Sequence, residues 1–371
     1  MNILKVNTKK IGAVLLLCSF FFGVTLDAQY TFTPDIDLSC TAVKSQARTG
    51  TCWSFSTVSF LESELIRLGE EPMDISEMYI VRLIYQDKAR NYFLRQGKAN
   101  FSEGSLAHDV IRAMDMGGLM LESEYSGLLP DQKSHNHSEM IKGMKGFMDG
   151  ILKNRKAGER WMPALNGIMD AYMGPIPVKN SAGQTPLQFG ASLPLKADDY
   201  LSFSSYNHHP FYESFILEIP DNYSNGSYYN VPVDELQAIV DAALKEGFTV
   251  SWDGDVGEKG FSAKNGLAVM PKDESREDLF EQPGAELKVD QELRQATFMS
   301  FATTDDHLMH IVGTAKDQQG NRYYKIKNSW GEVGPYDGFL YMSEAYFRLK
   351  TVGVLVHKDA VPADILEKCL P

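Results

Sequence analysis

A cysteine with the surroundings of a nucleophile stands in the stretch QARTGTCWSFS, residues 46–56. Cys52 comes directly before an amphipathic pattern, so we expect it at the start of a helix, where the partial positive charge of the N-terminus favours a thiolate. Its residue type leaves three interpretations open: a buried structural thiol, one end of a disulfide, or a nucleophile. Only a nucleophile needs a histidine base, a group that orients this base and an oxyanion donor.

Two of the eight histidines, His307 and His310, lie in the strand pattern HLMHIVGTA shortly before the segment KNSWG. Residues three apart on a strand point to opposite faces, so only one of the pair can face the site. Asn328 lies on the next strand of an expected hairpin, where its amide carbonyl can orient an imidazole without adding a negative charge. Trp330 can then shield the pair from water. Cys52, one of these histidines and Asn328 therefore predict nucleophilic catalysis.

Two classes of ligand are disfavoured. His307 and His310, with Asp305 and Asp306 nearby, are alternative metal ligands, but the strand separates the two rings and no further cysteine or histidine cluster completes a site. We therefore expect neither a metal nor another cofactor. The formal net charge of −13, with no stripe of lysine and arginine, argues against a nucleic acid as partner.

The elements that must position these residues change in kind along the chain. Apolar residues at steps of three and four predict helices, and alternating or short continuous apolar runs predict strands. The predicted helices cover about 53–69, 74–94, 102–118, 134–155, 160–174 and 233–247, and the predicted strands 248–255, 307–315, 322–330, 338–343 and 352–357. A helical first part and a β-rich last part predict an α+β fold of two lobes, with a cleft between them where distant residues meet.

The first 28 residues have the composition of an export signal. Three lysines precede the apolar run 11–26, and Leu-Asp-Ala before Gln29 resembles a cleavage site. We expect cleavage near Ala28 and a secreted or periplasmic protein without a membrane segment. An uncleaved or lipid anchor is the alternative.

Three cysteines remain after this cleavage: Cys40, Cys52 and Cys369. An odd number, in a compartment that permits disulfides, leaves one thiol over. A disulfide between Cys40 and Cys369 would leave Cys52 free, and three reduced thiols are the alternative.

Three blocks, QARTGTCWSFS, DHLMHIVG and KNSWG, resemble the active-site blocks of papain-fold cysteine peptidases. The resemblance implies that Gln46 belongs to the oxyanion hole and that Cys52 is the nucleophile. It selects His307 as the general base, with Asn328 orienting its ring and Trp330 shielding the pair. It also implies a helical N-terminal lobe and an antiparallel, barrel-like C-terminal lobe.

Two departures from the common pattern identify a branch. Thr49 stands where a papain-type signature has a cysteine, and the 255 residues from Cys52 to His307 exceed the roughly 130–150 of papain-like enzymes by on the order of a hundred. This resembles the bleomycin hydrolase and aminopeptidase C branch, whose papain core carries an insertion. Gly104 matches the second glycine of the loop that binds the substrate backbone, and Glu103 replaces the first, which puts a carboxylate near the non-primed subsites.

The resemblance implies four segments: a signal peptide (1–28), a helical lobe (29–130), an insertion (131–233) and a β-rich lobe (234–371). It implies peptide or protein substrates and an aminopeptidase whose C-terminal arm enters the cleft. It also implies a hexameric homo-oligomer. Because only AVPADILEKCLP follows the last strand pattern, an endopeptidase with an open cleft is the alternative. A catalytically silent papain-fold binding protein and a transglutaminase-like acyl transferase are less favoured, since every active-site position holds a competent residue type and KNSWG is not expected in the latter.

Overall fold

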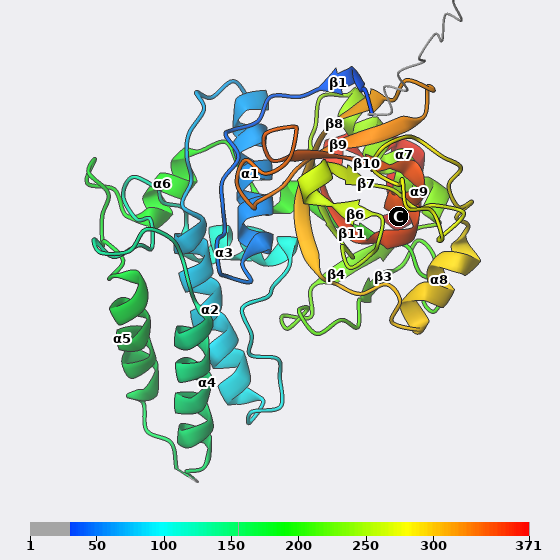
Figure 1. Cartoon of the computed structure of the whole chain (residues 1–371). Coiled ribbons are helices and arrows are strands. Elements are labelled where there is room, and N and C mark those ends of the chain that lie inside the picture. Colours follow the sequence, from blue (N-terminus) through cyan, green and yellow to red (C-terminus); the bar gives the residue numbers. More distant parts are fainter. Residues whose placement is uncertain (1–29, 155, 371) are drawn as a thin grey trace, which may run out of the picture.

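A computed structural model describes residues 30–154 and 156–370, which form a helical part packed against a large sheet (Figure 1). The predicted export signal, residues 1–28, lies outside the described residues and stays a prediction. In the ranges that the structure describes, no helix combines the length and the apolar character needed to cross a membrane.

Three helices form the base of the helical part: α1 (Cys52–Arg67), α2 (Glu77–Leu94) and α3 (Ala107–Gly117). All three were predicted, and their ends have the expected causes. The Ser76 hydroxyl accepts the Tyr79 backbone N–H at 3.0 Å at the start of α2. Gly69 follows α1 with φ of +88°, a conformation that glycine adopts without strain.

Three further helices come from the insertion: α4 (Ser138–Leu152), α5 (Trp161–Met173) and α6 (Pro186–Ser192). Helices α4 and α5 lie side by side and extend away from the sheet (Figure 1). The buried residues of α4 are Met140, Met144 and Met148, and this spacing of four aligns them on one face. The insertion therefore shares one apolar core with α1, α2 and α3.

The sheet has eleven strands: β1 (Thr33–Asp37), β2 (Tyr200–Ser204), β3 (Ser214–Ile216), β4 (Ser227–Asn230), β5 (Val250–Gly254), β6 (Phe261–Ser262), β7 (Leu267–Ala268), β8 (His307–Lys316), β9 (Arg322–Lys327), β10 (Phe339–Ser343) and β11 (Thr351–His357). Their order is β3-β4-β2-β11-β5-β8-β9-β10-β7-β6, with β1 paired to β8. All pairs are antiparallel except β10 with β7 and β2 with β4. The predictions of β5, β8, β9, β10 and β11 are confirmed.

Strand pairing crosses the segment boundaries that the sequence analysis drew. Strand β1, from the segment 29–130, pairs with β8, and β2, from the segment 131–233, pairs with β11. Strands β3 and β4 extend the same edge. A single strand shows no partner in its own sequence, so the short strands and turns expected in 202–230 did not reveal these pairings.

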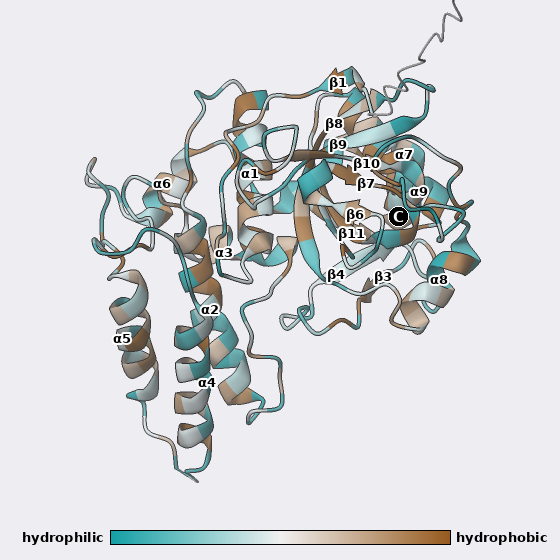
Figure 2. Ribbon diagram, viewed as in Figure 1, coloured by the Kyte–Doolittle hydropathy of each residue, from teal (hydrophilic) through white to brown (hydrophobic). Residues whose placement is uncertain are grey.

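Four helices accompany the sheet: α7 (Val233–Lys245), α8 (Gln291–Met299), α9 (Glu344–Lys350) and α10 (Ala363–Cys369). Three short 3₁₀ turns complete the described elements: Ala197–Asp199, Ala263–Asn265 and Lys358–Ala360. Only α7 was predicted, because the other helices have nine residues or fewer and show too little of the helical period. Apolar residues follow the central strands, and polar residues dominate the outer loops (Figure 2).

Helix α1 lies on the side of the helical part that faces the sheet (Figure 1), and 14 of its residues are buried. It packs directly on β8, so the first residue of α1 and the first residue of β8 can share one site. The arrangement confirms the α+β prediction of a helical first part and a mainly β last part. The proposed disulfide is wrong, since Cys40, Cys52 and Cys369 are all free thiols.

Candidate active site

Cys52 is the first residue of α1 and is 8% exposed. The backbone N–H groups of Trp53 and Leu308 hydrogen-bond its sulfur and favour the thiolate. Burial opposes them and dominates, raising the pKa of the thiol to about 12. The helix N-terminus is present as predicted, but it does not by itself lower the pKa of Cys52.

His307, the first residue of β8, is held by Asn328. Its Nε2 lies 2.8 Å from Asn328 Oδ1, and the same oxygen accepts the Ser329 backbone N–H at 2.7 Å. A backbone N–H can only donate, so this bond identifies the amide oxygen. His307 Nε2 therefore carries the hydrogen, and Nδ1 presents a lone pair, the form that a general base requires.

Trp330 covers this pair. Its ring stacks on the His307 ring with centroids 4.6 Å apart and planes 29° from parallel. His307 is 3% and Asn328 5% exposed, whereas Trp330 is 37% exposed. Because water is largely excluded, the hydrogen bond between His307 and Asn328 faces little competition.

Gln46 is fixed beside the same group. Its Oε1 accepts the Ser329 hydroxyl at 2.6 Å, and its Nε2 donates to the Thr49 carbonyl at 2.7 Å. Thr49 in turn donates its hydroxyl to the Gln46 carbonyl at 2.7 Å. Since an amide nitrogen has two hydrogens, one N–H of Gln46 is left for an oxyanion. Thr49 stands where a papain-type signature has a cysteine, and its hydrogen bonds hold the loop there.

Burial lowers the pKa of His307 to about 4, although the hydrogen bond to Asn328 opposes this shift. Burial therefore disfavours both a lone thiolate on Cys52 and a lone imidazolium on His307. Transfer of a proton from the thiol to Nδ1 would create both charges together, and their attraction would offset the cost of desolvation. A change of charge by the two groups as a pair is therefore the less costly route.

A cavity of about 670 Å³ opens beside Cys52. Glu103 and Gly104 both lie in its wall, as the resemblance implied. The Glu103 carboxylate accepts the Gly50 N–H at 2.7 Å, and its backbone carbonyl accepts the Trp53 indole N–H at 3.0 Å. Burial raises the pKa of Glu103 above its ordinary value. A carboxylate therefore borders the cavity, with one oxygen already engaged by the backbone.

A further part of the wall comes from the insertion, through Ile141, Lys142 and Lys145 of α4 together with Asp221. Asp221 lies against the backbone of Gly104, where a Cβ atom would come 1.8 Å from its Oδ2. A larger residue at this position would therefore require the Asp221 side chain to move. The insertion thus completes the cavity, which its sequence did not indicate.

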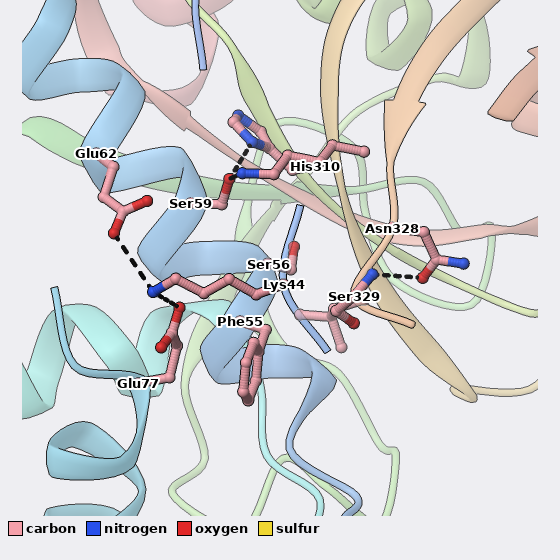
Figure 3. Close-up of a pocket in the computed structure, with 11 residues that line it drawn as sticks. Lys44, Phe55, Ser56, Ser59, Glu62, Glu77, His310, Asn328 and Ser329 are labelled. Carbon is pink, nitrogen blue, oxygen red and sulfur yellow. Dashed lines mark hydrogen bonds and ion pairs between the residues drawn. The ribbon is translucent and has the colours of Figure 1, made fainter. Parts of the chain in front are cut away.

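His310 faces away from this cavity, as the strand geometry predicted. Its Nδ1 lies 3.0 Å from the Ser59 hydroxyl, which also accepts from Lys327 Nζ at 2.7 Å. These residues line a small enclosed space behind Asn328, together with the ion pair of Lys44 and Glu77 at 2.7 Å (Figure 3). This polar interior joins α1 to β8 and β9 and so holds the catalytic elements in register.

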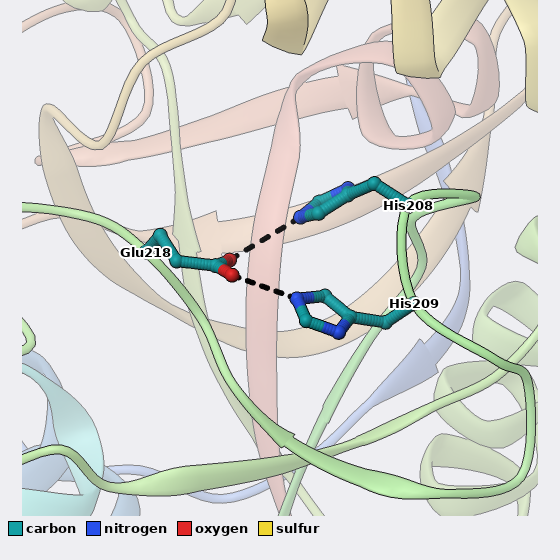
Figure 4. Close-up of side chains that lie close together, drawn as sticks. All are labelled: His208, His209 and Glu218. Atoms are coloured by element: carbon teal, nitrogen blue, oxygen red, sulfur yellow. Dashed lines mark hydrogen bonds and ion pairs between the residues drawn. The ribbon is translucent and has the colours of Figure 1, made fainter.

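A separate group of His208, His209 and Glu218 has the residue types of a metal site (Figure 4). The two Nε2 atoms lie 3.2 and 2.8 Å from the Glu218 oxygens. Gln295 Oε1 accepts the Asn207 backbone N–H at 2.5 Å, so its Nε2 must donate to His208 Nδ1 at 3.1 Å. In neutral His208 the hydrogen then sits on Nε2, so in this arrangement the atom donates to Glu218 and has no lone pair for a metal.

The sequence did not place three acids at this site: Asp221 and Asp305, which line the cavity, and Asp253, whose charge acts on Cys52. Asp305 was considered only as a metal ligand. For Asp253 the available signal was an acid directly after the buried Trp252 in the strand pattern FTVSWDGD. Ser329, which fixes both Gln46 and Asn328, was also missed, since nothing in KNSWG distinguishes its role.

Comparison with known proteins gives one consistent result. Residues 178–370 match the profile of the Peptidase C1-like family, and residues 34–169 match that of the Papain family cysteine protease. Aminopeptidase W of Lactobacillus delbrueckii subsp. lactis is 26% identical over 383 residues, covering 90% of this chain and 85% of the relative. Aminopeptidase C of Streptococcus thermophilus is 21% identical, with coverage of 92% and 85%.

A human (Homo sapiens) bleomycin hydrolase is 30% identical over 165 residues, 43% of this chain and 34% of the relative. The crystal structure of PepW from Lactobacillus rhamnosis superposes with a TM-score of 0.74 at 17% identity, covering 92% of this chain and 85% of that chain. The structural match supports the α+β papain-like fold predicted from the sequence.

Proposed function

Because this chain belongs to the Peptidase C1-like family and is a cysteine peptidase, we propose that it hydrolyses peptide bonds through an acyl-enzyme on Cys52. The observation that carries the proposal is the 2.8 Å bond from His307 Nε2 to Asn328 Oδ1. This bond leaves Nδ1 of His307 free to act as a base. The next residue of the same strand, Leu308, donates its backbone N–H to the Cys52 sulfur.

In the first step, the Cys52 proton passes to His307 Nδ1 as the sulfur attacks the substrate carbonyl carbon. The developing oxyanion is bound by the second N–H of Gln46 and by the backbone N–H of Cys52. Loss of one such donor typically costs about 2.7–4 kcal/mol of transition-state stabilisation.

In the second step, the His307 imidazolium gives its proton to the leaving amine, and the C–N bond breaks. His307 then takes a proton from water, which attacks the thioester and releases the acid with regeneration of the Cys52 thiol. Asn328 holds the ring in one orientation throughout, and Trp330 keeps bulk water from their hydrogen bond.

The cleaved end is proposed to be the amino terminus, as the names of the relatives suggest. Glu103 borders the cavity and offers a negative charge toward a free α-ammonium group. One observation favours the alternative of an endopeptidase. Helix α10 packs into the core of the sheet through Ile365 and Cys369, and among the described residues none from 363–370 lines the cavity.

We also propose export through residues 1–28, on the composition of that segment alone. Recovery of the mature chain outside the cytoplasm, beginning near Gln29, would support it. A cytoplasmic chain that keeps this segment would contradict it. Assembly into a hexamer stays a prediction, for which sedimentation of the mature protein is the direct measurement.

Peptide hydrolysis is tested with free and N-acetylated forms of one fluorogenic peptide amide, using the native protein and Cys52→Ala. We expect turnover by the native protein and none by Cys52→Ala, with both variants equally folded by circular dichroism. Preference for the free peptide would support the aminopeptidase, and equal or better cleavage of the acetylated peptide would support the endopeptidase. Full activity of Cys52→Ala would overturn the proposal.

A further inference from the structure

Two carboxyl groups, those of Asp253 and Asp305, meet beside the cavity that adjoins Cys52. Strands β5 and β8 pair with Asp253 directly opposite Leu308, so these two side chains project from the same face of the sheet. Leu308 and Asp305 both line the cavity. Asp253 and Asp305 interact through their side chains, and both raise the pKa of the Cys52 thiol by their negative charge. The pair is therefore close to the reacting sulfur.

Apart from their contact with each other, the two carboxyls have few hydrogen-bond partners. Asp253 is only 4% exposed, yet no donor among the described residues reaches either of its side-chain oxygens, and Asp305 Oδ2 also lacks a donor. Buried polar groups are normally hydrogen-bonded, so a buried carboxylate in this condition is costly. A cation that enters the cavity would supply the missing donors and the missing positive charge.

Burial raises the pKa of Asp305 to about 7, with the charge of Asp221 adding to the shift, and raises the pKa of Asp253 well above its ordinary value. Two neighbouring carboxyls in this condition share a proton, because their like charges disfavour double ionisation. A bound cation reverses this preference, since it favours the ionised form of both groups.

Two of the three nearby lysines donate hydrogen bonds to other groups, although the charge of Lys88 also acts to lower the pKa of Asp305. Lys88 donates from Nζ to the Gly104 carbonyl, and Lys145 pairs with Asp149 at 2.8 Å. Lys142 lines the cavity from α4, and its charge acts on Glu103. The cavity wall also carries the carboxyls of Glu103, Asp221 and Asp306. Acids therefore outnumber lysines around the space that a substrate would enter.

We propose that Asp253 and Asp305 bind a cationic group of the peptide substrate and so set the specificity of the peptidase. The cation is an ammonium or guanidinium group on the amino-terminal side of the scissile bond. It comes either from the side chain of a lysine or arginine that precedes the cleaved residue or from the free α-amino group of the cleaved residue itself. The inference rests on the proposed function and adds a substrate class to it.

The volume of the cavity supports a side chain as well as an amine. About 670 Å³ falls within the usual range of ligand pockets, roughly 300–1,000 Å³. A guanidinium group can bridge two carboxyls with several N–H donors, which matches the missing donors of the pair. A neutral side chain such as leucine would leave the two carboxyls with only each other as partners.

The test uses four amides with the same fluorescent leaving group: free alanyl, acetyl-alanyl, acetyl-arginyl-alanyl and acetyl-leucyl-alanyl. Each is measured with the native protein, Asp253→Asn and Asp305→Asn. Asp364→Asn serves as the matched control, because it removes one negative charge at a side chain of α10 that is 76% exposed. Ratios of kcat/KM between two substrates on one preparation do not depend on the folded fraction.

We expect the native protein and Asp364→Asn to favour one cationic substrate over its neutral counterpart by about ten- to hundredfold, as for hydrogen bonds to charged groups. Asp253→Asn and Asp305→Asn should reduce that ratio to within about threefold of one. A reduced arginyl-to-leucyl ratio identifies the side chain as the source, and a reduced free-to-acetylated ratio identifies the α-amino group.

Unchanged ratios in both asparagine variants would overturn the inference while the proposed function stands, provided that the native protein cleaves these amides. If the native protein cleaves none of them and no other peptide, the proposed function fails and the inference fails with it. If one variant loses all activity, the substrate ratios of the other variant decide the test. The two variants differ in burial, since Asp305 is partly exposed at the cavity wall and Asp253 is buried.

Discussion

Replacement of His307 by alanine tests whether Cys52 and its base change charge as a pair. Burial raises the pKa of the Cys52 thiol to about 12, and His307 is the group that we propose accepts its proton. In His307→Ala the thiol has no base. At pH 7 the thiolate fraction of Cys52 is then 10^(7−12), or about 10⁻⁵, from its pKa of about 12.

An exposed cysteine with a pKa of about 8.5 has a thiolate fraction of about 3% at pH 7. Alkylation of Cys52 in His307→Ala should therefore be about three thousand times slower than that of an exposed cysteine, since the thiolate is the reacting form. The native protein should react far faster than the variant, because proton transfer to Nδ1 supplies the thiolate. In the variant the rate should rise about tenfold per pH unit between about pH 6 and 10, because the thiolate fraction does so at every pH below the pKa of about 12.

The assay follows iodoacetamide addition to the Cys52 peptide by mass spectrometry between pH 6 and 10, which separates it from Cys40 and Cys369. The matched control is His357→Ala, which removes a different buried histidine of the sheet. We expect the control to react like the native protein. If His307→Ala reacts as fast as the native protein at pH 7, the helix N-terminus and backbone donors suffice, and the paired-charge argument is wrong.

Asn328→Ala removes the acceptor of His307 Nε2 and leaves a buried donor unsatisfied, so we expect kcat to fall about 5- to 150-fold, for about 1–3 kcal/mol; a change in KM alone would contradict this. Gly104→Ala places a Cβ atom 1.8 Å from Asp221 Oδ2 and should raise KM by displacing the cavity wall, whereas unchanged kinetics would show that Asp221 moves freely. Burial, aided by a nearby lysine, lowers the pKa of His310 well below its usual 6.5. The unfolded chain then binds a proton below pH 6.5 that the folded chain does not, so stability is present above pH 6.5 and falls as the pH drops. His310→Asn should flatten this slope by about 1.4 kcal/mol per pH unit in urea titrations between pH 6.5 and 5, and an unchanged slope would exclude His310 as its source.

Local patterns predicted the elements that carry the candidate catalytic residues. The amphipathic run after Cys52 gave α1, and the strand patterns around His307 and Asn328 gave β8 and β9. These elements are long enough to show their own period. The strands β1 to β4 and the helices α8 to α10 are short, and their stability comes from pairing or packing with distant segments, so their sequences carried little signal.

The candidate catalytic residues could likewise be predicted from the sequence, because each of them stands in a short block whose residues contact one another. Gln46 and Thr49 bond within one loop, and Asn328 is fixed by the backbone of Ser329. The protonation behaviour was not readable: burial raises the pKa of Cys52, whereas the helix N-terminus alone would lower it. Desolvation depends on every atom around the thiol, and most of those atoms come from elsewhere in the chain.

The sequence by itself determined which chemistry this chain can perform, since that depends on a few side chains in local blocks. The tertiary structure decided what surrounds that chemistry. Asp253 and Asp305 are 52 positions apart in the sequence and meet because β5 pairs with β8 in one register. A shift of that register by one residue would turn Asp253 to the other face of the sheet. Substrate recognition therefore rests on strand pairing, which no single stretch of sequence contains.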